Sequence, residues 1–166
     1  MKNGPLIPLA QQTAMKTGAH IRPATATDLP AVQSCARAAY TQYLDRMDRE
    51  PAPMVADFAS LIQHRHVHVA LLGGNIVGYV VFYTKGESMQ LDNVAVSPEF
   101  TGQGIGKQLI NFVETSASKQ GLLAVELYTN VAMTENQVLY PKLGYTITAH
   151  KQQDGFSRVF YRKLLS

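Results

Sequence analysis

The chain has 166 residues, of which 46% are hydrophobic and 16% charged, a composition that excludes a disordered protein and allows one domain with a real hydrophobic core. The formal net charge of +3 is too small and too scattered to predict nucleic-acid binding, although it suits a polyanionic cofactor. A single cysteine, Cys35, excludes an internal disulfide and a zinc site built on a cysteine pair, and it favours a reducing, cytoplasmic setting.

The N-terminal segment predicts a flexible leader. Residues 1–18 combine two prolines, two glycines and many polar residues, without the continuous apolar core of a signal peptide. No apolar run in the chain approaches the roughly 18 residues that a membrane span needs. We therefore expect a leader over residues 1–18 and a single domain over residues 19–166, with no membrane partner.

The first half of this domain predicts one strand, two helices and a hairpin. A short strand over residues 20–22 precedes a helix that begins at Thr27, where apolar residues start to recur at helical spacing. After two prolines, a second helix is expected over residues 54–63. Alternating residues over 67–71 and a β-branched and aromatic run over 76–83 flank a Gly-Gly-Asn turn, which is typical of a hairpin.

The second half predicts four more strands and two more helices. The strands are expected over residues 88–96, 122–128, 145–151 and 158–164, and the helices over residues 104–119 and from Thr134, with Gln137 completing a capping box. The resulting order β, αα, βββ, α, β, α, ββ predicts a central mixed sheet with helices around it.

A glycine-rich loop predicts an anion site. The sequence Thr101-Gly102-Gln103-Gly104-Ile105-Gly106-Lys107 follows a buried strand and opens an amphipathic helix. Glycines let backbone amides approach a ligand, and the start of a helix adds free N–H groups and the positive end of its dipole. The spacing fits neither a Walker loop, which needs glycine at position 101, nor a dinucleotide fingerprint, which needs glycine at position 107.

The loop and the strand before it resemble the signature of the GNAT superfamily of N-acetyltransferases, in which an apolar-Ala-Val-x-Pro strand end precedes Arg/Gln-x-x-Gly-x-Gly/Ala. Val94-Ala95-Val96-Ser97-Pro98 matches the first part and residues 101–106 match the second, with Thr101 in place of the usual Arg or Gln. The resemblance covers about residues 20–164. It implies an α/β (α+β) fold with a mixed, mostly antiparallel sheet of about seven strands flanked by about four helices.

The same resemblance implies acetyl-CoA as co-substrate and no metal. The backbone of Val94, Ala95 and Val96 would pair with the pantetheine arm as if it were another strand. Thr101 and Gly102 would begin the phosphate loop, and the amides of Gln103, Gly104, Ile105, Gly106 and Lys107 would hold the pyrophosphate.

A second segment, Thr134 to Tyr145, resembles the superfamily's Asn-x-x-x-Tyr-x-x-x-Gly-Phe/Tyr pattern. Asn136 and Tyr140 are four residues apart and share a helix face. The resemblance implies that Asn136 contacts the pantetheine arm and that Tyr140 lies near the thioester sulfur, where a phenol can give a proton to the leaving thiolate. The alternative for Tyr140 is simple packing against the sheet. Pro141 is expected to kink the helix just after this tyrosine.

An amine acceptor must lose a proton before it attacks the thioester. Asp92, on the strand of the pantetheine site, is the candidate base, and Glu126 with a water chain is another; a polar residue at a strand edge explains Asp92 equally. The resemblance implies an acceptor that is a primary amine of a small molecule or of a protein. Its site is expected around Tyr40, Tyr43, Asp45, Arg46, Asp48 and Arg49 and near the last two strands, although a solvated helix end explains these residues too.

Three function classes therefore compete. The leading one is an acetyltransferase that works by direct amine attack, and the second is a non-catalytic acyl-CoA sensor or regulatory module. A nucleotide-binding protein is disfavoured by the loop spacing. A homodimer is the default assembly for a small enzyme. His64, His66 and His68 lack a completing carboxylate or cysteine, so the sequence predicts no metal site.

Overall fold

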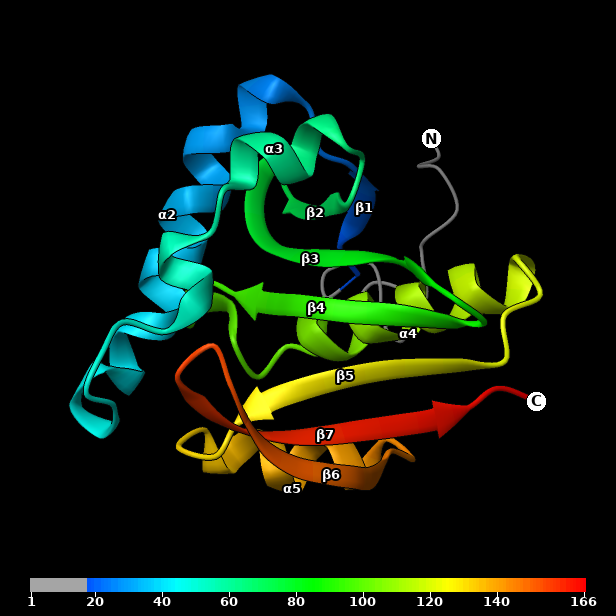
Figure 1. The fold of residues 1–166 in the computed structure, drawn as a ribbon. Helices are drawn as coiled ribbons and strands as arrows, with labels where there is room; N and C mark the ends of the chain where they lie inside the picture. The colour runs from blue at the N-terminus through cyan, green and yellow to red at the C-terminus, as the bar shows by residue number, and fades with distance from the viewer. Residues whose placement is uncertain (1–17) are drawn as a thin grey trace, which may run out of the picture.

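A seven-stranded sheet in the order β1-β2-β3-β4-β5-β7-β6 runs through the molecule (Figure 1). The computed structural model describes residues 18–166, so residues 1–17 of the expected leader lie outside the described part. The strands are β1 (His20–Pro23), β2 (Val67–Leu72), β3 (Asn75–Lys85), β4 (Ser88–Val96), β5 (Ala124–Asn130), β6 (Thr146–Gln153) and β7 (Phe156–Leu164). All neighbouring pairs are antiparallel except β4 and β5, which are parallel.

Helices cover both faces of the sheet and form two separate hydrophobic clusters. On one face lie α2 (Leu29–Tyr40) and α3 (Phe58–Gln63), and on the other lie α4 (Ile105–Lys119) and α5 (Thr134–Lys142). Strand alternation divides the central residues between them, because Val80 packs in the cluster of α4 while Tyr79 and Val81 pack in that of α2. The expected fold, a mixed and mostly antiparallel sheet of seven strands with four α-helices among the described residues, is confirmed.

Three expectations about helix boundaries need correction. The first helix is preceded by the 3-10 turn η1 (Ala26–Asp28), which Thr25 caps, so it does not begin at Thr27. The single helix expected over residues 54–63 is divided into η3 (Ala52–Val55) and α3, because Asp57 caps a new start by accepting from the Ser60 amide at 3.1 Å.

The capping box expected at the start of α5 is also wrong. Thr134 is the first helical residue and Met133 precedes it as the cap position. The Gln137 side chain donates instead to the Val131 carbonyl at 2.8 Å, outside the helix. The helix continues through Pro141 and ends at Lys142.

The parallel pair β4–β5 separates halfway along its length. Its pairing runs from Ser88 and Ala124 only to Leu91 and Leu127. Beyond that point β4 stays paired to β3 and β5 to β7, so the two strands diverge toward their C-terminal ends, as Figure 1 shows. The register of β4 against β3 skips Asp92, which makes this residue a β-bulge at the mouth of the gap. The connection from β4 to α4 includes the short 3-10 turn η4 (Pro98–Phe100).

None of the helices described is both long and apolar enough to cross a membrane.

Candidate active site

A cavity of about 340 Å³ lies where β4 and β5 separate. Gly106 and Ile110 line it from the α4 face of the sheet, while Tyr43 and Met47 line it from the α2 face. Since its walls come from both faces, the cavity passes through the sheet. Two molecules that enter from opposite faces can therefore meet inside it.

The exposed edge of β4 forms one wall of this cavity. Val94, Ala95 and Val96 all line it. The Tyr40 hydroxyl, at the end of α2, donates to the Val94 carbonyl at 3.1 Å and to the Asn93 side-chain oxygen at 2.8 Å. These bonds attach α2 to the diverging strand and keep its edge in place. The carbonyl has a second lone pair, so a ligand that runs along β4 can also bind it.

The glycine loop presents a row of unpaired amides. Gly102 and Gly104 both have a φ of +82°, a conformation that favours glycine. Among the described residues, no backbone acceptor bonds the amides of residues 102–107, and the first helical bond is Gln108 N–H to the Gly104 carbonyl at 3.0 Å. The Thr101 hydroxyl donates within the turn, to the Pro98 carbonyl at 2.8 Å. This loop can therefore bind an anion through main-chain donors and the helix dipole.

The expected loop residues divide between two cavities. Thr101 and Gly106 line the through-sheet cavity. Gly104 and Lys107 line a second, more polar one on the α4–α5 side, together with Lys142 and Lys163. Gly102, Gln103 and Ile105 line neither cavity, and the Ile105 side chain is buried in the core.

Tyr140 is a buried phenol in the wall of the through-sheet cavity. It is 4% exposed, and its ring packs on Tyr145 and Tyr161 with centroids 5.9 and 5.6 Å apart. Burial raises the pKa of Tyr140 well above its ordinary value, so the phenol stays protonated at neutral pH. The Tyr140 hydroxyl has no hydrogen-bond partner in the part of the chain that the structure describes, and the residue lines the cavity. The Tyr140 ring packs in the core beside the sheet, which was the alternative role expected from the sequence. Its hydroxyl is also a free donor at the cavity wall.

Asn136 lies one turn before Tyr140 on α5 and also lines the cavity. The side-chain amide of Asn136 donates to the Thr129 hydroxyl at 3.0 Å.

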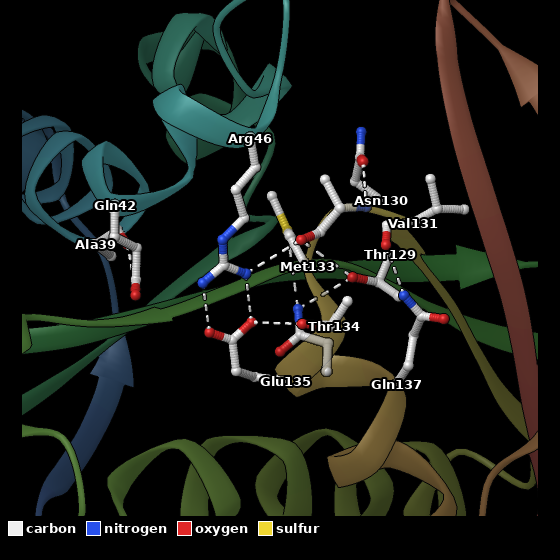
Figure 2. A network of polar contacts seen from close by, with 12 residues as sticks. Ala39, Gln42, Arg46, Thr129, Asn130, Val131, Met133, Thr134, Glu135 and Gln137 are labelled. Atoms are coloured by element: carbon white, nitrogen blue, oxygen red, sulfur yellow. Dashed lines mark hydrogen bonds and ion pairs between the residues drawn. The ribbon is translucent and has the colours of Figure 1, made fainter.

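Figure 2 shows the surrounding polar network, in which Arg46 reaches from η2 (Thr41–Arg46) to the start of α5. Its guanidinium binds both Glu135 oxygens, at 2.7 and 2.9 Å, and the Ala132 carbonyl at 3.1 Å. This contact joins η2 to the start of α5.

Asp92 projects into the cavity from the bulge in β4. One of its oxygens accepts from the Tyr128 hydroxyl at 3.1 Å, and the other has no partner among the described residues. Burial, reinforced by the Asp92 charge, raises the pKa of Tyr128, so this phenol remains a donor. Glu126, the other candidate base, does not line the cavity and accepts instead from Arg162 at 3.0 Å. The arrangement therefore favours Asp92 over Glu126.

The expected acceptor surface is only partly in the site. Tyr40 and Tyr43 line the cavity, but Asp45 and Asp48 do not. Arg49 lies over the Phe156 ring at 4.7 Å and donates to the Asp154 carbonyl at 3.1 Å, so it joins the η2–η3 segment to the β6–β7 hairpin.

Sequence reasoning missed five lining residues on the neighbouring strands β5 and β7: Tyr128, Thr129, Asn130, Phe156 and Arg158. Tyr128 shares a face of β5 with Asn130, and Asn130 pairs with Arg158 in the register of β5 and β7. Strand alternation could have grouped the residues within each strand. The pairing of β5 with β7, which brings them to one place, was not readable from the sequence.

Two of the three histidines pack on aromatic residues of β3, whereas His64 is exposed at the end of α3. His66 stacks on Tyr83 and His68 on Phe82, with ring centroids 5.0 and 5.1 Å apart. Over residues 18–166, no three His, Cys, Asp or Glu side chains are grouped so that they could hold a metal ion.

Comparison with known proteins identifies the family. The model of the acetyltransferase (GNAT) domain matches residues 63–147, just over half of the chain. YvbK, an uncharacterised N-acetyltransferase of Bacillus subtilis (strain 168), is 27% identical over 60% of this chain, and the match spans 64% of that relative, just under two thirds of its length. A second protein of that strain, provisionally named ribosomal protein bS18-alanine N-acetyltransferase, is 23% identical over 78% of this chain and 82% of its own.

The solved structures agree in fold. The PaiA N-acetyltransferase of Thermoplasma acidophilum, in complex with coenzyme A, superposes with a TM-score of 0.74 at 19% identity, over 89% of this chain and 99% of that one. Sequence motifs, sheet topology and family match lead to the same result: this chain belongs to the GNAT superfamily of N-acetyltransferases.

Proposed function

We propose that this chain transfers the acetyl group of acetyl-CoA to a primary amine by direct attack, within the domain formed by residues 19–166. The observation that carries the proposal is the cavity through the sheet. It joins a strand edge and a loop of free amides to a buried phenol, Tyr140, and a carboxylate, Asp92.

The cofactor would enter from the α4 face. Its pantetheine arm would run along Val94, Ala95 and Val96 in the gap that β5 leaves open. Its pyrophosphate would bind the amides of residues 103–107, and its remaining phosphate would face the second cavity, where Lys107 and Lys142 supply positive charge while Lys163 is paired with Glu114. The Asn136 side chain would border the arm near its thiol end.

The reaction then needs three proton transfers. Asp92, directly or through a water, takes the proton of the ammonium ion as the amine becomes a nucleophile. The amine nitrogen bonds to the thioester carbon, the positively charged nitrogen loses a second proton to water, and the C–S bond breaks in the resulting tetrahedral intermediate. Tyr140 gives its proton to the departing sulfur, so that coenzyme A leaves as a thiol. Bulk water restores the proton of Tyr140 and removes that of Asp92.

The acceptor is a primary amine carried by a small molecule or by a protein; the relative named for ribosomal protein bS18-alanine acetylation illustrates the second kind. A cytoplasmic location agrees with the unpaired, buried thiol of Cys35. We also propose a homodimer as the starting hypothesis for its assembly.

Thiol release from acetyl-CoA, measured against a panel of amines, tests this function. We expect release that depends on both the protein and the amine, and a melting temperature that rises when acetyl-CoA is added. A rise in melting temperature without turnover on any amine would instead support the non-catalytic acyl-CoA sensor. If acetyl-CoA neither raises the melting temperature nor releases thiol with any amine, both functions are excluded.

A further inference from the structure

One cation lies buried in the wall of the through-sheet cavity. Arg158, on β7, has a side chain that is 6% exposed, and it lines the cavity together with Asp92 and Tyr128. It is the one buried Lys or Arg among residues 18–166. A guanidinium in such a place loses most of its hydration, so its remaining donors need partners.

The structure gives partners to only one of its nitrogens. The Nη1 atom donates to the Gln153 side-chain oxygen at 2.8 Å and to the Asp154 carboxylate at 3.3 Å. Nε and Nη2 have no hydrogen-bond partner among the described residues, and neither atom is fully buried. The Asp154 side chain is 78% exposed, so water screens much of its charge. The guanidinium therefore has free donors, and Asp154 compensates its positive charge only in part.

A tyrosine links this cation to the candidate base. The Arg158 guanidinium lies 4.3 Å from the centroid of the Tyr128 ring, and the hydroxyl of the same ring donates to Asp92. The second aromatic neighbour, Phe156, lies 5.2 Å from the guanidinium. This part of the cavity thus has a carboxylate at one end of a phenol ring, a guanidinium over its face, and apolar walls between them.

We propose that the acceptor is a small amino-carboxylate, whose amine faces Asp92 and the thioester while its carboxylate binds Arg158. This assignment rests on the proposed acetyl transfer and specifies its substrate. A planar guanidinium with adjacent free donors at Nε and Nη2 matches the two oxygens of a carboxylate. A protein N-terminus carries an amide where such a substrate carries its carboxylate, so it would leave Nε and Nη2 of Arg158 without an anionic partner.

The test compares each of the twenty amino acids with its own carboxamide as acceptor, by thiol release from acetyl-CoA. We expect the wild-type kcat/KM to favour at least one acid over its amide by about 10- to 100-fold, the range for hydrogen bonds to charged groups. The amine of an amide is less basic than that of the acid, so easier deprotonation cannot produce this preference.

Arg158→Gln should reduce the ratio of acid to amide to near one, mainly through the KM of the acid, and Arg158→Lys should leave an intermediate ratio. Arg162→Gln is the matched control, because Arg162 lies on the same face of β7 but pairs with Glu126 outside the cavity, so its ratio should equal that of the wild type. If Arg158→Gln does not fold, the Arg158→Lys variant supplies the test: a lowered ratio of acid to amide supports the inference, and an unchanged ratio contradicts it.

Three results would overturn the inference: equal wild-type rates on acids and amides, a preference that persists in both Arg158 variants, or turnover only on peptides or amines without a carboxylate. Failure of the acetyl transfer itself looks different, because no amine would then release thiol from acetyl-CoA, whether or not acetyl-CoA binds.

Discussion

At the scale of single residues, the account depends most on the hydroxyl of Tyr140, a protonated donor that no other described group engages. Tyr140→Phe removes this hydroxyl and keeps the ring that packs on Tyr145 and Tyr161. We expect kcat to fall about 100- to 10,000-fold, the usual range for general acid catalysis, with little change in acetyl-CoA affinity. Steady-state kinetics and a binding titration measure the two quantities separately.

Tyr161→Phe is the control for this variant. The Tyr161 hydroxyl is buried without a partner, and its ring packs on that of Tyr140. Removing it should leave kcat within about twofold and raise the free energy of unfolding by up to about 1 kcal/mol, because an unsatisfied polar group disappears. An equal loss of kcat in both variants would mean that the effect is not specific to the hydroxyl of Tyr140, and it would contradict proton donation by this residue.

Asp92 yields a prediction about pH. In Asp92→Asn no carboxylate takes the proton from the ammonium group of the acceptor, so the acceptor must be deprotonated by solvent before it attacks. We expect kcat/KM to fall most at neutral pH and to recover as rising pH deprotonates the amine in solution. Rate profiles of the two proteins between about pH 6 and pH 10 measure the difference. A deficit that is constant across this range would exclude Asp92 as the base.

At the scale of elements, an ion pair holds the entry to α2. Arg22 on β1 binds both oxygens of Asp28, at 2.8 and 3.1 Å, and Asp28 also accepts from the Thr25 amide at 2.7 Å. The hydrogen bond from Arg22 is the main reason that the pKa of Asp28 falls from 3.8 to about 2. A lowered pKa stabilises the folded state above the unfolded value of 3.8, and this contribution is lost as pH falls through about 2.

Asp28→Asn keeps an acceptor for the Thr25 amide but removes the charge. We expect its free energy of unfolding at pH 7 to be about 1–2 kcal/mol lower than that of the wild type. The difference should shrink between pH 4 and pH 2. Urea unfolding at several pH values measures it, and parallel pH dependences of the two proteins would contradict the role of this pair.

The sequence predicted those elements whose local signals agree with their surroundings. The strand over residues 88–96 was predicted at its observed bounds. The glycine loop that the sequence singled out turns through positive φ angles at Gly102 and Gly104. The capping box at Thr134 failed because Gln137 found an acceptor in the preceding loop, at Val131. Arg158 was overlooked because its place in the site depends on the pairing of β5 with β7 and on the turn of the β6–β7 hairpin, both of which are tertiary features.

At the scale of the whole molecule, one parallel pair in an otherwise antiparallel sheet makes the site. The pairing of β4 and β5 ends early, and separate hydrophobic clusters support the sheet on either side of the gap. The cavity can therefore receive one substrate from each face without opening either core. This geometry suits a reaction in which a long cofactor and a short acceptor meet at the thioester.

The central claim is that the amides of the glycine loop bind the cofactor's pyrophosphate, and titration calorimetry with coenzyme A tests it most directly. Gly104→Asp places a carboxylate beside these amides, whereas Gly74→Asp introduces the same change at a hairpin turn with the same φ of +82° and equally open space. We predict that the wild type and Gly74→Asp bind coenzyme A with similar affinity and that Gly104→Asp binds at least about tenfold more weakly. No heat of binding with the wild type, or equal affinity in all three folded proteins, would contradict the account.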